Sequence, residues 1–204
     1  MIRRLLTVML AAVAVSGGAA ALAGPASAAT SRSLSIAWEA QINYYYCGPA
    51  STRMAMKART SSPPSQTTIG NYMGTDVNGT DDIGNVVGAL NHFLNTSWYQ
   101  AKYISYSATQ AQHDLLKYDT VFDVDRSYAL VANIWIVPGG VHPPGYPNYE
   151  VLHYVTIVGY SNSGESVQVA DPAAGLGDFA NVPHTYWVST WDMANMIGGK
   201  GYAA

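Results

Sequence analysis

The chain has 204 residues, of which 49% are hydrophobic and only 11% are charged, and its formal net charge is −3. This length suits one domain with a hydrophobic core. The mild acidity and the lack of a basic cluster beyond the first residues argue against a nucleic-acid partner.

The beginning of the chain has the pattern of an export signal. Arg3-Arg4 precedes an apolar run from Leu5 to Val15, and Ala26-Ser27-Ala28 is a small-residue cleavage site. The run is too short for a membrane span, which needs about 20 apolar residues. We therefore predict a signal peptide at residues 1–28, no membrane span, and a secreted protein in which residues 29–204 form a single domain.

The next informative segment surrounds Cys47, the one cysteine of the chain. Pro49 suits the first turn of a helix, and Ala50 and Met54 follow at helical spacing, which predicts a helix from about residue 49 to residue 59. A thiol at a helix start lies at the positive end of the peptide dipoles, which favours the thiolate. Cys47 is therefore a candidate nucleophile. The alternative is a buried small hydrophobic residue.

Apolar periodicity and helix- or strand-breaking residues predict the remaining elements in chain order. Helices are expected at residues 66–73, along the apolar stripe from Ile83 to Leu94 with Asp81 or Thr80 as its cap, at 109–117 and at 189–197. Strands are expected at residues 99–106, 129–137, 153–160, 166–171 and 184–188. Helices early and strands late imply an α+β domain in which the two kinds of element are partly segregated.

Among the five histidines, His153 is the candidate general base, because it opens a strongly β-prone run that would hold the ring rigidly. A hairpin follows, and if Ser161 pairs with Glu165, Asp171 lies diagonal to the histidine on the same sheet face. A loop one residue longer would send Asp171 to the opposite face unless a bulge restored it. Asp171 is thus a candidate to orient the imidazole. The alternative is an Asp-Pro turn that merely ends the strand.

Two further sets of residues are expected to complete the site. Gln41 precedes Cys47 by six residues, so its amide can fold back over the helix start and donate, with the cysteine N–H, to an oxyanion. The loop from residue 138 to residue 150, rich in Pro and Gly, either walls a cleft or is an ordinary surface connection. We expect substrate contacts from Tyr46, Gly48, Gly140, His142 and Tyr154.

The motif pieces resemble those of family thirty-nine of the cysteine peptidases, the double-glycine, bacteriocin-processing type of the papain superfamily. They are Gln41, Cys47-Gly48-Pro49-Ala50-Ser51, His153-Tyr154-Val155 with Gly159, and Asp171-Pro172. The resemblance implies a papain-like fold, in which a helical lobe with the cysteine packs on an antiparallel sheet with the histidine and aspartate. It also implies Cys47 as nucleophile, His153 as base, Asp171 as orienting group and Gln41 in the oxyanion hole.

The expected function is that of a secreted, monomeric cysteine peptidase that hydrolyses peptide bonds in peptide or protein substrates. No metal and no organic cofactor are expected, because no residue cluster has metal-ligand spacing. Two alternatives stay open. The same triad could serve a cell-wall amidase or transpeptidase, or the domain could be a non-catalytic binding protein with an aromatic peptide groove at residues 44–46.

Overall fold

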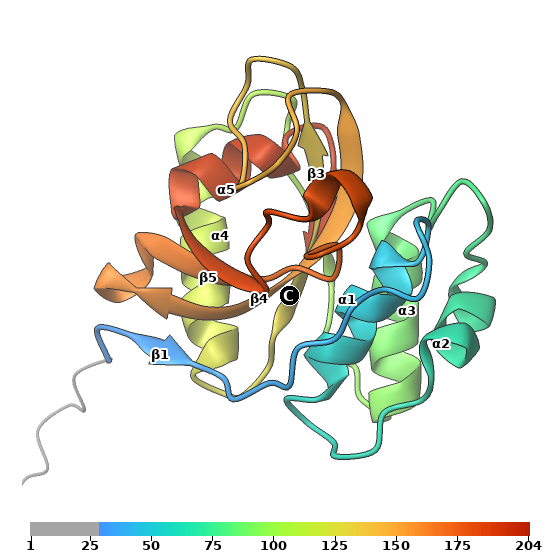
Figure 1. Ribbon diagram of the computed structural model, residues 1–204. Coiled ribbons are helices and arrows are strands. Elements are labelled where there is room, and N and C mark those ends of the chain that lie inside the picture. The colour runs from blue at the N-terminus through green and yellow to red at the C-terminus, as the bar shows by residue number, and fades with distance from the viewer. Residues whose placement is uncertain (1–28) are drawn as a thin grey trace, which may run out of the picture.

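The computed structural model describes residues 29–204, so the predicted signal peptide at residues 1–28 lies outside the described part of the chain. Helices and an antiparallel sheet make up the described residues, and the predicted α+β class is confirmed. In Figure 1, α1, α2 and α3 stand together at the right, and the sheet lies at the left with α4 and α5. None of the helices within residues 29–204 combines the length and the apolar character needed to cross a membrane.

The helices begin at residues that satisfy their first N–H groups, with one exception that matters for the site. They are α1 (Cys47–Met56), α2 (Gln66–Met73), α3 (Ile83–Leu94), α4 (Gln110–Val124) and α5 (Thr190–Ile197). Side chains of Ser65, Asp82, Thr109 and Ser189 cap the last four of these helices. The side chain of Tyr46, before α1, makes no such bond. The predicted cap of α3 is wrong, because Asp82, and neither Asp81 nor Thr80, accepts from a backbone N–H of the first turn.

The strands form one antiparallel sheet in the order β2-β7-β3-β4-β5-β6, with β1 paired to β4. Their bounds are β1 (Arg32–Ser33), β2 (Ala101–Tyr103), β3 (Leu130–Ile136), β4 (Val151–Ser161), β5 (Ser166–Ala170), β6 (Thr185–Ser189) and β7 (Gly201–Ala203). Short 3₁₀ turns occupy Asn162–Gly164 and Gly177–Phe179.

Several elements differ from their predicted bounds by a few residues, two of them, β2 and α4, by more, and β7 was not predicted. The predicted strand at residues 99–106 contracts to β2, whereas the predicted helix at 109–117 extends to Val124 because its apolar face continues through Leu116 to Val124, both buried. The strand β7 has no prediction at all, since three residues are too few for a visible period. It pairs with β2 and β3 and so brings the end of the described chain into the sheet.

The sheet is covered on both faces. Apolar side chains of α4 and α5 form one core cluster with the sheet, and those of α1, α2 and α3 form the other. Strand β3 contributes Ala132 and Ile134 to the first cluster and Val131 to the second, as expected for side chains that alternate between faces. This double coverage explains the near-continuous apolar run that predicted a buried strand.

The β4–β5 hairpin sets the position of the residue that follows it, Asp171. Its loop is one residue longer than predicted, because Ser161 pairs with Ser166. A bulge between Ile157 and Gly159 then shifts the register, so that Thr156 pairs with Ala170 as the predicted register requires. The extra residue of the bulge therefore cancels the extra residue of the loop.

Candidate active site

Cys47 is the first residue of α1, and its side chain is almost fully buried. It lies where the unbonded N–H groups of a helix concentrate positive potential. Gly48 lets this helix start approach the neighbouring loop closely, because a Cβ at that position would lie 2.4 Å from the Thr80 hydroxyl. The beginning of α1 thus packs against Thr80 at a distance that leaves no room for a side chain at position 48.

Two buried hydrogen bonds fasten α1 to β4, the strand that carries His153. The Ser51 hydroxyl donates to the Tyr154 carbonyl at 2.9 Å, and the Thr156 hydroxyl donates to the Ser51 carbonyl at 3.0 Å. Buried bonds of this kind are costly to break, because each partner would be left without one. They fix the register of the helix against the strand and so the place of the thiol beside the imidazole.

His153 and Asp171 form a buried pair. The His153 Nε2 atom lies 2.9 Å from Asp171 Oδ1, and the aspartate side chain is fully buried. With Nε2 turned toward the carboxylate, Nδ1 is the ring nitrogen left to face the Cys47 thiol, whose pKa responds to His153. The structure therefore brings together the three residues that the sequence singled out as nucleophile, base and orienting group.

The Asp171 carboxylate accepts further hydrogen bonds from groups that the sequence analysis missed. Tyr146 and Tyr186 donate their hydroxyls to Oδ2 at 2.6 Å and 3.0 Å, and the Ala173 N–H donates to Oδ1 at 2.9 Å. Tyr146 belongs to the loop rich in Pro and Gly, and Tyr186 points inward from β6. The only sequence signal for Tyr146 was its stiff loop, and a single inward tyrosine in a strand gives none.

These contacts favour the charged forms of both Asp171 and His153. Burial, the largest influence on Asp171, raises its pKa, but His153, Tyr146 and the Ala173 N–H together lower that pKa below the ordinary carboxyl value. Burial is also the largest influence on His153, and it lowers the pKa of the imidazole. The charge and hydrogen bond of Asp171, helped by Cys47, outweigh burial and raise this pKa to about 10. The imidazole is therefore held in its charged form.

Cys47 responds to that charge. Burial is again the largest influence and raises the pKa of the thiol, yet the hydrogen bond and charge of His153, with backbone N–H groups at Tyr154 and Gly48, outweigh it. The net effect is a lowered thiol pKa. A lowered thiol pKa and a raised imidazole pKa both favour a thiolate–imidazolium pair near neutral pH.

Gln41 lies beside this pair in a segment that is held on both sides. Its backbone N–H donates to the Pro172 carbonyl at 3.0 Å, and its side-chain Nε2 donates to the Asn43 carbonyl at 2.8 Å. Gln66 clamps the flanking residues, since it donates to the Ala40 carbonyl and accepts from the Ile42 N–H. Gln41 Oε1 is buried and has no hydrogen-bond partner.

Two cavities flank the Cys47–His153 pair, and Leu152 lines both of them. The histidine-side cavity, of about 220 Å³, is lined by Gln41, Tyr44, Tyr149, Glu150, Val151, Leu152, His153, Ala173, Leu176 and Phe179. The cysteine-side cavity, of about 230 Å³, is lined by Cys47, Asn78, Gly79, Thr80, Asp81, Asn133, Leu152, Tyr154 and Lys200. The chain thus offers one open space on each side of the reactive pair.

The predicted substrate contacts are scattered. Tyr154 lines the cysteine-side cavity, and Gly48 packs on its wall. Tyr46 lines neither cavity and packs over Gly70 in the helical lobe. Gly140 lines a separate hollow beside Tyr106 and Trp135, and His142 donates from Nδ1 to the Gly140 carbonyl at 2.6 Å without lining either cavity. The loop rich in Pro and Gly instead contributes Tyr149 and Glu150 to the histidine-side cavity.

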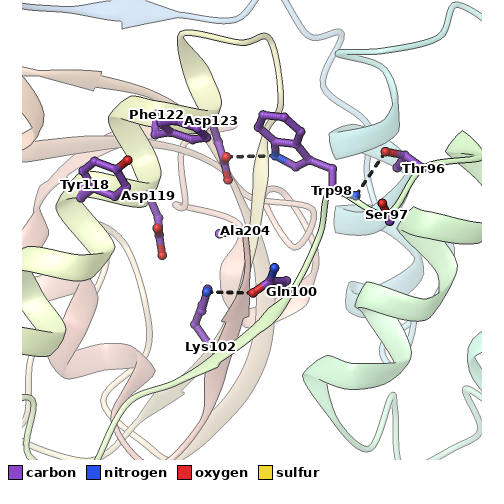
Figure 2. A pocket seen from close by; sticks show the side chains of 10 residues that line it. All are labelled: Thr96, Ser97, Trp98, Gln100, Lys102, Tyr118, Asp119, Phe122, Asp123 and Ala204. Atoms are coloured by element: carbon purple, nitrogen blue, oxygen red, sulfur yellow. Dashed lines mark hydrogen bonds between the residues drawn. The ribbon is translucent and has the colours of Figure 1, made fainter.

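A larger hollow, of about 400 Å³, lies between α4 and the segment that leads into β2 (Figure 2). Trp98 donates from Nε1 to Asp123 at 3.0 Å, and burial, more than any other influence, raises the pKa of Asp123 to about 6. No cysteine or histidine lines this hollow. Within residues 29–204, no group of three or more His, Cys, Asp and Glu side chains could hold a metal ion.

The helical lobe that carries the cysteine, the antiparallel sheet that carries the histidine, and the buried pair between them define a papain-like cysteine peptidase. Xylellain, a cysteine protease from Xylella fastidiosa, superposes with a TM-score of 0.51 at 10% identity, over 87% of this chain and 86% of that one. The peptidase domain of Streptococcus ComA, a bifunctional ABC transporter involved in quorum sensing, superposes with a TM-score of 0.50 at 15% identity, over 82% of this chain and 95% of that one.

The chain belongs to the Peptidase_C39 like family, whose sequence profile matches residues 33–194. This match confirms the family resemblance inferred from the sequence. A double-glycine motif protease from an AMS/PCAT transporter, in complex with its leader peptide, is also similar, with a TM-score of 0.48 and 16% identity over 83% of this chain and 91% of that one. No curated protein sequence matches the chain significantly.

Proposed function

We propose that this cysteine peptidase hydrolyses peptide bonds with Cys47 as nucleophile, His153 as general acid and base, and Asp171 as the group that orients the imidazole. The observation that carries the proposal is the buried arrangement of Cys47, His153 and Asp171, called the catalytic row below. His153 lies 2.9 Å from Asp171 through Nε2, which leaves Nδ1 to face Cys47, and His153 is among the groups that lower the thiol pKa. The pKa shifts of all three groups have the directions that such a mechanism needs.

The reaction follows from these charges. The Cys47 thiolate attacks the carbonyl carbon of the scissile amide, and His153 gives its proton to the leaving nitrogen, which departs as an amine. A thioester to Cys47 remains. His153, now neutral, takes a proton from water, whose oxygen attacks the thioester, so that the carboxylic acid leaves and the thiolate and imidazolium are restored.

Gln41 is proposed to stabilise the oxyanion of each tetrahedral intermediate. Its side-chain amide carries a second N–H besides the one bound to the Asn43 carbonyl, and α1 begins at Cys47 without a side-chain cap. A helix start with uncapped N–H groups and a nearby amide are the donors that developing negative charge requires. The clamp that Gln66 places on residues 40 and 42 keeps this amide in position.

The proposal includes a site of action outside the cell and a monomeric state. The export signal at the beginning of the chain supports secretion. Mass spectrometry of the protein from culture medium is expected to find Ala29 as the first residue, and size-exclusion chromatography a single-chain mass. Retention of the intact signal in the cell fraction would contradict secretion.

A mixed peptide library tests the reaction class. Wild-type protein is expected to cleave a subset of the peptides, and mass spectrometry of the products gives the scissile bond. Cys47→Ala is expected to leave all of them intact. Intact peptides beside released fragments of cell-wall material would contradict the peptidase proposal and indicate a cell-wall amidase.

A further inference from the structure

The two cavities beside the reactive pair face different parts of a bound substrate. The inference rests on the proposed function, in which His153 protonates the leaving nitrogen. The amine must therefore lie on the side of the imidazole, and the residue that carries it extends into the histidine-side cavity. The acyl part, bonded to the sulfur, extends toward the cysteine-side cavity.

The histidine-side cavity exposes apolar and aromatic surface to solvent. Tyr44 is 75% exposed, Leu152 57% and Tyr149 43%, and Leu176 and Phe179 complete the apolar lining. Large apolar side chains gathered around a concave surface mark a binding site more than singly scattered ones do. The cysteine-side cavity differs in its side chains, because Asn78, Thr80, Asp81, Asn133 and Lys200 line it, although polar and apolar atoms share the exposed lining of each cavity about equally.

Both exposed tyrosine rings lie against the same short segment of the chain. The Tyr149 hydroxyl donates to Asp178 Oδ2 at 2.9 Å. The Tyr44 hydroxyl lies over Gly177, where a Cβ would come within 2.7 Å of it and where φ is +46°, so glycine makes room for the ring. Since Gly177 and Asp178 share one 3₁₀ turn, a single short segment seats both rings.

The same turn anchors the cavity to the catalytic row. Phe179, its last residue, packs against Tyr146 at a ring-centroid distance of 5.1 Å and against His153 at 6.3 Å. The apolar floor of the cavity is therefore continuous with the groups that hold Asp171. A side chain that enters the cavity would lie directly beside the proton donor.

Charge at the cavity disfavours acidic ligands. Glu150 lines it and accepts from Trp135 Nε1 at 2.8 Å, and Asp178 lies behind Tyr149, whereas the positive charge of His153, which also lines it, is already paired with Asp171. An acidic side chain would meet like charge there, whereas an aromatic or aliphatic one would remove apolar surface from water. A volume of about 220 Å³ accommodates one large side chain.

We propose that the histidine-side cavity is a specificity pocket for the residue directly after the scissile bond, and that it selects an aromatic or large aliphatic side chain. Tyr44 and Tyr149 are its specificity-determining residues. Acidic residues at that position are rejected.

Matched peptides test the proposal by kcat/KM. A sequence cleaved in the library is resynthesised with Phe, Leu, Gly or Asp directly after the scissile bond and is otherwise unchanged. Because burying a Phe or Leu side chain stabilises a complex substantially, Phe and Leu are expected to exceed Gly roughly tenfold, with Asp slowest. Equal values for Phe and Gly would overturn the proposal.

Three variants assign the preference to the pocket. Tyr44→Ser and Tyr149→Ser are each expected to bring the ratio of Phe to Gly peptides down several-fold, while the matched control Tyr118→Ser, in which an exposed tyrosine of α4 is changed, keeps the wild-type ratio. The ratio is insensitive to any general loss of activity, because both peptides share the catalytic groups. A ratio that survives both pocket variants would assign the preference elsewhere and overturn the proposal.

The pocket can also be tested without turnover, which separates its failure from that of the proposed function. If wild-type protein hydrolyses none of the peptides, the amine products are compared instead by NMR titration of Cys47→Ala with phenylalanine amide and glycine amide. Tighter binding of phenylalanine amide that is lost in the Tyr44→Ser background would support the pocket while the peptidase proposal fails. Equal binding of the two amides would overturn the pocket itself.

Discussion

Cys47 takes its position from the start of its own helix, although groups of β4 lower its pKa, whereas the Asp171 carboxylate is held by side chains from separate segments. Cys47 opens α1 and receives the effect of the helix start together with the Gly48 N–H. Asp171 receives Tyr146 from a loop, His153 from β4 and Tyr186 from β6. Cys47, the proposed nucleophile, is thus placed by local structure and Asp171, the proposed orienting group, by tertiary structure, so the two residues should respond differently to mutation.

The largest expected difference is between Cys47→Ala and Asp171→Ala, which should both lose activity but should differ in stability. Cys47→Ala and Asp171→Ala should each reduce kcat/KM strongly, by at least about 10⁴-fold for the cysteine. Asp171→Ala also removes the carboxylate that pairs with His153 and accepts from the Tyr146 and Tyr186 hydroxyls, so it should lower the free energy of unfolding by about 3–5 kcal/mol. Cys47→Ala should lower it by only about 1 kcal/mol.

Urea unfolding of both variants measures the comparison. Similar losses of stability would show that the two ends are held in the same way.

A second change separates the oxyanion donor from the thiolate. Gln41→Ala should lower kcat about 10²–10³-fold, because one donor to the oxyanion is lost. Alkylation of Cys47 by iodoacetamide forms no oxyanion, so its rate should stay at the wild-type value. Gln100→Ala, which changes a glutamine bonded to Lys102 away from the site, is the control. A parallel fall in alkylation would mean that Gln41 acts on the sulfur instead.

A smaller effect is expected from removing the Tyr146 hydroxyl, one of the groups from distant segments that hold Asp171. Tyr146→Phe removes the 2.6 Å bond to Asp171, one of the contacts that lower the pKa of that carboxyl. The pKa of Asp171 should therefore rise, and the acidic limb of the kcat/KM profile should move to higher pH, with a loss of about 1.5–3 kcal/mol in unfolding free energy. The exposed Tyr106→Phe serves as control. An unmoved acidic limb would leave Tyr146 with a purely structural role.

The smallest effect concerns stability as a function of pH. A raised His153 pKa stabilises the folded state fully below the unfolded value of about 6.5, and that stabilisation is lost as the pH rises toward about 10. In wild type a second group cancels this effect between about pH 6.5 and 8.5. The folded protein holds a proton on His153 that the unfolded chain has lost, but the unfolded chain holds a proton on Cys47 that the folded thiolate has lost, so the stability changes little with pH.

Cys47→Ala removes the offset. Its unfolding free energy should fall by about 1 kcal/mol from pH 7 to pH 8, while that of wild type changes little. Chemical denaturation at the two pH values measures this directly. A flat profile for Cys47→Ala would show that His153 is neutral in the folded variant, so that Asp171 alone does not keep the imidazole charged.

The difference between the two ends also explains what could be predicted from the sequence. The α1 helix, its cysteine and the buried β3 strand have strong local patterns, and all were expected close to their observed positions. The hairpin that delivers Asp171 was expected with the right final register, although its loop and its bulge compensate in a way that strand patterns do not encode.

Contacts made by distant segments were not predictable. Tyr146 and Tyr186 reach Asp171 only after the sheet and the loop are assembled, and Tyr149 lines the cavity where Gly140 and His142 were expected. The sequence placed the loop rich in Pro and Gly near the site but gave no means to tell which of its side chains turn inward. The roles of the site residues stay predictions until they are tested.

The central claim is that Cys47 is a thiolate because His153 carries a proton beside it. The most direct measurement is the rate of Cys47 alkylation by iodoacetamide near pH 6, in native wild type and in His153→Gln. An ordinary thiol with a pKa of about 8.5 would be only about 0.3% ionised at that pH, so the account predicts rapid labelling of wild type and slow labelling of the variant. Slow labelling of native wild type, with rapid labelling only after unfolding, would contradict it.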